Sequence, residues 1–163
     1  MYRRNVVGII STLSLLLVFN FSYAEDDCPL KTEPRKLQLS PSLIQEEKLN
    51  PVKGTYTASL KSGDAVLANY ATCSLSMQAH YLIHKETEPS DLMYLLNRFS
   101  GSVLFNSEMR EKAKKIIQAS SLDNIKNKMV VDGQQDSHQF TIIPIENEFF
   151  SYRIFYQWIP PEV

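Results

Sequence analysis

The feature that most constrains the fold is the alternation of apolar and polar residues near the end of the chain. Between residues 149 and 159, large apolar side chains recur at every second position, separated by Ser151, Arg153 and Gln157. A period of two is typical of a strand with one buried face, because successive side chains point to opposite sides of a sheet. The face expected to enter the core carries Phe150, Tyr152, Ile154, Tyr156 and Trp158.

The same reasoning predicts a helical middle with strands on both sides. Strands are expected at residues 55–60, 128–132 and 138–146, and the β-like run 65–84 exceeds one average strand, so a bend is expected near residues 69–72. Apolar residues at helical spacing predict helices over 92–101, from residue 107 and from about residue 121. This order predicts a single α+β domain, a twisted antiparallel sheet with two or three helices packed on one face. A β-sandwich with a helical insertion is the alternative.

Residues 1–24 have the layout of a cleavable secretory signal. Arg3 and Arg4 precede an apolar run over residues 6–19, and the small residues Ser22 and Ala24 predict cleavage after Ala24. The apolar run is shorter than the roughly 20 residues that span a bilayer, although an uncleaved anchor is the alternative. Four prolines predict an irregular segment over 25–54, with room for a helical turn over residues 42–49, and residues 55–163 are the expected globular domain.

A leader of this kind implies a secreted or periplasmic protein, and it changes the interpretation of the cysteines. Cys28 and Cys73 are the two cysteines of the chain, and in an oxidising compartment they are predicted to form one disulfide. Free or intermolecular thiols are an alternative. A redox-active pair is disfavoured because the two residues do not form a C-x-x-C motif.

Removal of the leader also changes the net charge. The whole chain has 17 basic and 18 acidic residues, and the leader holds two of the basic ones, so the remaining chain carries a net charge of −3. A nucleic-acid-binding protein needs a basic face, and this balance argues against one. No integral membrane segment is expected after residue 24.

The motifs of enzymes and metal sites are missing from the sequence. His80 and His84 share one face of a predicted strand, where they would lie about 13 Å apart, too far to chelate one ion. The metalloprotease motif, the G-x-S-x-G nucleophile elbow and grouped glycines for phosphate binding do not occur. We therefore expect no metal, no cofactor and no catalytic residue, and a non-enzymatic role is favoured over an enzymatic one.

The strongest candidate contact residues lie on the outer face of the last strand. Phe149, Arg153 and Phe155 alternate with the stripe assigned to the core, and aromatic residues and arginine dominate protein interfaces. The favoured hypothesis is a small exported protein that binds a protein partner, such as an inhibitor, an immunity protein or an accessory factor of the envelope or of secretion. One alternative is a small extracytoplasmic hydrolase with a Ser, His or carboxylate cluster around His80, His84 or His138. Another is a structural subunit of a surface assembly.

Overall fold

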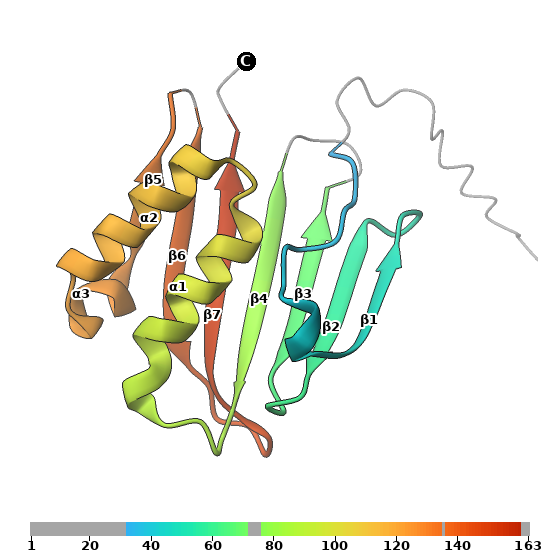
Figure 1. The fold of residues 1–163 in the computed structure, drawn as a ribbon, viewed down its shortest axis with the longest axis horizontal. Coiled ribbons are helices and arrows are strands. Elements are labelled where there is room, and N and C mark those ends of the chain that lie inside the picture. Colours follow the sequence, from blue (N-terminus) through green and yellow to red (C-terminus); the bar gives the residue numbers. More distant parts are fainter. Residues whose placement is uncertain (1–31, 72–75, 135, 161–163) are drawn as a thin grey trace, which may run out of the picture.

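The computed structural model describes residues 32–71, 76–134 and 136–160, and within these ranges seven strands form one open antiparallel sheet. The order of the strands across the sheet is β1-β2-β3-β4-β7-β6-β5 (Figure 1). The helices follow β4 and precede β5, which confirms the predicted α+β class. The strands are β1 (Ile44–Asn50), β2 (Thr55–Leu60), β3 (Ala65–Tyr70), β4 (Met77–His84), β5 (Met129–Asp132), β6 (Ser137–Pro144) and β7 (Phe150–Ile159).

Three α-helices occur in the described ranges, α1 (Leu92–Val103), α2 (Ser107–Ala119) and α3 (Leu122–Asn127), and they lie on one face of the sheet (Figure 1). Their starts follow ordinary capping chemistry. The Asn106 side chain accepts a hydrogen bond from the Glu108 backbone N–H at 2.8 Å, and Ser121 accepts one from Asn124 at 3.4 Å. Both contacts satisfy backbone donors that the first turn of a helix leaves unpaired.

The core lies between this sheet face and the helices. Alternate residues of every central strand are buried there, together with the apolar stripes of α1 and α2. In β7, Ile154 and Tyr156 are buried, while Tyr152 and Trp158 pack partly buried against the core, which confirms the predicted face for these four residues. Phe150, the fifth residue assigned to that face, is half-buried and does not belong to the core, because a register shift between Ile83 and His84 separates it from the regular pairing of β4 with β7. The phenol groups of the buried tyrosines still find partners, as buried hydroxyl groups require. Tyr56 donates to Glu47 and Tyr81 to Asp64, each at 2.8 Å.

The prediction of an irregular segment was wrong over residues 44–50, which form the edge strand β1. The helical turn expected over residues 42–49 was wrong from residue 44 onward, because the 3-10 turn Pro41–Leu43 ends where β1 begins. The prolines had suggested irregular chain, but Pro41 lies before the strand and Pro51 in the turn after it, so neither removes a donor from its ladder. Residues 32–43, which precede β1, run across the helix side of β2 and β3 (Figure 1). Leu37 and Leu39 are buried there.

The bend expected near residues 69–72 is a complete reversal of the chain. Tyr70 of β3 pairs with Met77 of β4, so residues 65–84 form an antiparallel hairpin and not one bent strand. Residues 72–75, which include Cys73, lie outside the described ranges, as do Cys28 and the whole predicted leader. The hairpin between β2 and β3 turns at Gly63, whose φ of +88° is readily adopted only by glycine.

Candidate functional site

The sheet face opposite the helices is covered by none of the elements in the described ranges (Figure 1). A solvated face of an antiparallel sheet usually carries polar side chains. Here the centre of that face holds large apolar residues around one cation, and all of them are half-buried by their neighbours. We name these residues the open-face patch: Leu67, His80, Leu82, Ile143, Arg153 and Phe155.

The register of three strands builds this patch. His80 of β4 lies opposite Phe155 of β7, and their ring centroids are 5.1 Å apart. Arg153 of β7 lies between Leu82 and Ile143, its cross-strand partners on the two neighbouring strands. Directly paired side chains in a sheet contact one another, so the patch is one continuous surface.

Three buried polar atoms, two in the patch and one beside it on β7, have no hydrogen-bond partner in the part of the chain that the structure describes. The Nδ1 atom of His80, the Oγ atom of Ser151 and the Nε atom of Arg153 are buried, and each lacks a hydrogen bond there. Burial lowers the pKa of His80, and the nearby Arg153 lowers it further, so the imidazole is neutral at pH 7. The cationic charge of the patch therefore comes from Arg153 alone.

Phe149, the third residue of the predicted contact set, is separated from the other two. Arg153 and Phe155 are next neighbours on one face of β7, whereas Phe149 lies four residues before Arg153, about 13 Å along a strand. The Phe149 side chain is 59% exposed. The structure thus brings together Arg153 and Phe155, and it adds Leu67, Leu82 and Ile143, which the sequence did not single out, and His80, which the sequence offered only for metal binding or hydrolysis.

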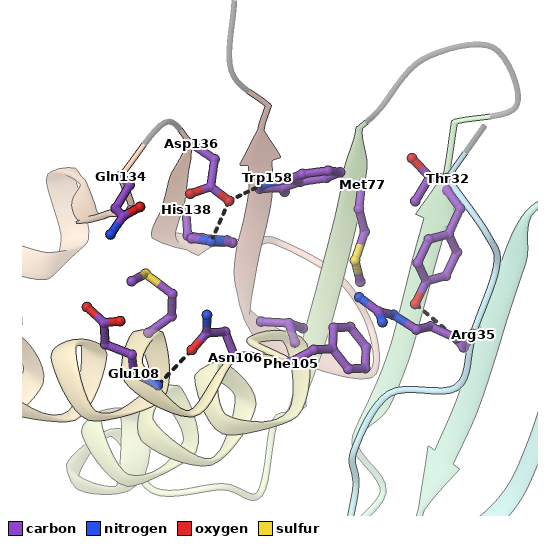
Figure 2. A pocket seen from close by; sticks show the side chains of 14 residues that line it. Thr32, Arg35, Met77, Phe105, Asn106, Glu108, Gln134, Asp136, His138 and Trp158 are labelled. Atoms are coloured by element: carbon purple, nitrogen blue, oxygen red, sulfur yellow. Dashed lines mark hydrogen bonds and ion pairs between the residues drawn. The ribbon is translucent and has the colours of Figure 1, made fainter. Parts of the chain in front are cut away.

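A second candidate site is a cavity of about 560 Å³ on the helix side, at the end of the sheet where β4 begins and β7 ends. Its walls come from residues 32–35, from the α1–α2 connection and from the β5–β6 turn. Figure 2 shows Arg35 and Met77 on one side of it and Gln134, Asp136 and Glu108 on the other. The guanidinium carbon of Arg35 lies 3.4 Å from the ring centroid of Phe105.

A hydrogen-bonded network forms one wall of this cavity. Asp136 accepts a hydrogen bond from the indole N–H of Trp158 at 2.9 Å, and its carboxylate lies 3.4 Å from Nε2 of His138 (Figure 2). On the other side of the ring, Nδ1 of His138 lies 2.9 Å from the Tyr156 hydroxyl. We assign the neutral tautomer with the proton on Nε2, which fits both contacts. Burial lowers the pKa of His138 more than the Asp136 carboxylate raises it.

This network suits binding better than proton transfer. A general base needs a ring nitrogen within reach of the substrate. Both ring nitrogens of His138 are engaged by Asp136 and Tyr156. His80 and His84 lie on β4, away from this cavity, so the structure does not gather the three histidines. Within the described ranges, no group of three or more His, Cys, Asp or Glu side chains could hold a metal ion.

The sequence did not point to Arg35, Phe105 or Asp136. Arg35 lies in a segment without periodicity, Phe105 follows a helix, and Asp136 lies between the strands expected at residues 128–132 and 138–146. Their convergence depends on residues 32–43 crossing the sheet and on the connection between the helices. No local pattern of apolar or polar residues indicates that residues 32–43 cross the sheet or that the connection between the helices lies beside them.

Comparisons with known proteins give no relative for this chain: no protein family, curated protein or solved structure matches it. Among the described residues, no helix is both long enough and apolar enough to cross a bilayer.

Proposed function

We propose that this is an exported binding protein that engages a partner protein through the open-face patch. The observation that carries the proposal is a continuous group of apolar side chains around Arg153, on a sheet face that no described helix covers. A contiguous, partly exposed apolar patch with a polar rim is typical of an interaction site. An arginine flanked by an aromatic ring is the kind of pair that contributes most to interface energy.

The charges of this face favour a partner that presents a carboxylate. Arg153 has no ion pair in the described ranges, and the acidic residues of the same face, Glu46 and Asp132, lie on the two edge strands. A second copy docked face to face would place two Arg153 side chains together without an acid between them. A heterologous partner with an apolar surface and a central Asp or Glu would satisfy the arginine instead.

Site-directed photocrosslinking tests this proposal in the organism that exports the protein. A photoreactive phenylalanine analogue at Phe155 is expected to yield one discrete adduct, because the ring lies inside the contact. The same analogue at Lys114, an exposed position on α2, is the matched control and should yield none. The Arg153→Glu substitution is expected to reduce the adduct at Phe155 at least tenfold, since it places a like charge against the partner's acid.

Circular dichroism would verify that the Arg153→Glu protein is folded, and Lys114→Glu provides the same change of charge on the helix side. An adduct at Phe155 that survives Arg153→Glu, or equal crosslinking from both positions, contradicts the proposed contact. An adduct with a second copy of the chain would favour the structural-subunit alternative. That result would be accompanied by self-association in size-exclusion chromatography.

Export and the disulfide are part of the same proposal. Thr32, four residues after Cys28, and Tyr70, three residues before Cys73, line the same cavity. The Tyr70 hydroxyl donates to the backbone oxygen of Arg35 at 2.7 Å. Four residues of chain reach about 13 Å, so two described neighbours of the cysteines that line one cavity support the proposed bond. A bond that closes a ring of about 46 residues contributes on the order of 4 kcal/mol in the chain-entropy description.

Peptide mass mapping of the exported protein without reductant tests both statements. We expect an N-terminus at Glu25 and a linked peptide pair that contains Cys28 and Cys73 and separates on reduction. Two thiols that react with maleimide in denaturant before reduction would rule out the bond. An N-terminus at Met1 would rule out cleavage.

The hydrolase alternative receives less support from the geometry. The cavity near His138 is the kind of site that it requires, but both ring nitrogens of that histidine are occupied. Thr32 is the one serine or threonine among the described residues that line the cavity. The binding proposal needs no such chemistry.

A further inference from the structure

The cavity beside His138 has the size and composition of a small-molecule site. Its volume of about 560 Å³ lies within the range of ligand pockets, about 300–1,000 Å³. It opens on the helix side of the sheet, whereas the open-face patch lies on the other side. A ligand bound here would therefore leave the proposed protein contact accessible.

Arg35 is the group in this cavity with unused binding capacity. Its guanidinium carbon lies over the Phe105 ring, 3.4 Å from the ring centroid, and the guanidinium makes no ion pair or side-chain hydrogen bond within the described ranges (Figure 2). Stacking fixes the plane of the guanidinium while its N–H groups remain available at the edge. Such an arrangement suits a planar anion that accepts two parallel hydrogen bonds.

The charges around the cavity limit the anion to a single negative charge. Arg35 is the one arginine or lysine among the described lining residues, and His138 is neutral. Asp136 and Glu108 contribute negative charge on the opposite side, although Lys112 lies 3.6 Å from the Glu108 carboxylate. A phosphate dianion would be attracted by one cation and repelled by two acidic side chains. A carboxylate carries half the charge, so the two acidic side chains repel it half as strongly.

The remaining wall is apolar and adaptable. Met77, Val103, Phe105, Met109 and Trp158 line it. Methionine side chains adjust to irregular shapes, and aromatic rings add large contact areas. The ligand that fits these surroundings has an apolar body and one carboxylate at its end.

We propose that this cavity binds a small organic carboxylate, with its carboxylate on Arg35 and its apolar body against Phe105, Met77 and Trp158. The same chemistry occurs in a free small acid and in the C-terminal carboxylate of a peptide. The side chain of Trp158 is the single indole of the chain, so its fluorescence reports directly on this cavity.

The test is a fluorescence titration of the full exported protein with four probes. They are 4-phenylbutyrate, the neutral 4-phenylbutanamide, and the tripeptide Ala-Leu-Phe with a free or an amidated C-terminus. A saturable change with a Kd below about 1 mM is expected for an acid, with the matching amide at least about tenfold weaker. The tighter of the two acids identifies the source of the carboxylate.

Substitutions at Arg35 separate charge recognition from apolar binding. Arg35→Gln should weaken the acid about tenfold, to the affinity of its amide, while Arg35→Lys should retain part of the preference. Lys36→Gln is the matched control, because the neighbouring Lys36 does not line the cavity and pairs with Glu47 at 2.6 Å. The acid should bind this control unchanged.

Two results would overturn the proposal. One is the absence of a saturable change for both acids up to about 20 mM, well above the affinity expected for a pocket of this size. The other is an acid that binds Arg35→Gln as tightly as it binds the original protein. Neither result bears on the open-face patch, whose test is the crosslink at Phe155.

Discussion

The buried carboxylate of Asp64 is expected to be a main source of stability in the first half of the sheet. Asp64 follows the β2–β3 turn and is 2% exposed. It accepts hydrogen bonds at 2.8 Å from the Tyr81 hydroxyl, the His84 backbone N–H and the Ser62 hydroxyl. The Arg98 guanidinium lies 3.8 Å from the carboxylate and also donates to the Tyr81 hydroxyl.

Asp64→Ala removes the carboxylate that accepts all three of these hydrogen bonds. The Tyr81 hydroxyl and the His84 N–H would lose their partner, at about 1–3 kcal/mol each, and the half-buried Arg98 would lose its counter-charge. We therefore expect a loss of about 3–5 kcal/mol in the free energy of unfolding, in the range of a broken buried ion pair. Asp64→Asn keeps an acceptor for the His84 N–H and should lose about half as much.

Urea denaturation followed by circular dichroism measures this loss. The midpoint should fall while the slope with denaturant stays constant, because the surface exposed on unfolding is unchanged. Asp123→Ala is the control, since that side chain is 89% exposed and pairs with Lys126 at the surface; its expected cost is below about 0.5 kcal/mol. A cost below about 1 kcal/mol for Asp64→Ala would refute the argument from unpaired buried groups.

Two further predictions concern the histidines and the β5–β6 turn. Burial lowers the pKa of both His80 and His138, so below about pH 6.5 the unfolded chain binds more protons than the folded one. The free energy of unfolding is therefore highest above that pH and decreases as the pH falls. His80→Gln should flatten the dependence of the unfolding free energy on pH between about pH 7 and pH 5. Gly133→Ala would place a Cβ in collision with the Asp136 carboxylate, and displacing that carboxylate should lower the free energy of unfolding in urea by about 1–3 kcal/mol. Gly101→Ala in α1 meets no atom within 4 Å and should instead stabilise by about 0.5–1 kcal/mol; equal effects of the two changes would contradict this.

Local periodicity was sufficient to predict most of the elements. The strand predicted at 149–159 is β7, Phe150–Ile159, and the face assigned to the core is the buried one. The helix expected to end at Gly101 continues to Val103 as α1, and Asn106 caps α2. These features depend on side chains within a few residues of one another, which is the range over which sequence patterns carry information.

The edge strand β1 shows why other elements were missed. Its sequence, Ile44–Asn50, carries charged residues at consecutive positions and no clear alternation. It becomes a strand because β2 offers a free row of backbone donors and acceptors, and charged side chains are tolerated at a sheet edge. Pairing with a neighbour, and not local preference, determines its structure.

The sequence by itself determined the α+β class, which face of β7 is buried, and the outer position of Arg153 and Phe155. Each follows from a repeat of side chains along the chain. Only the tertiary structure decided what lies beside them. The strand register placed His80 against Phe155, and the path of residues 32–43 brought Arg35 to Phe105. Both contacts join residues far apart in the chain, so they depend on how complete elements pack and not on any local pattern.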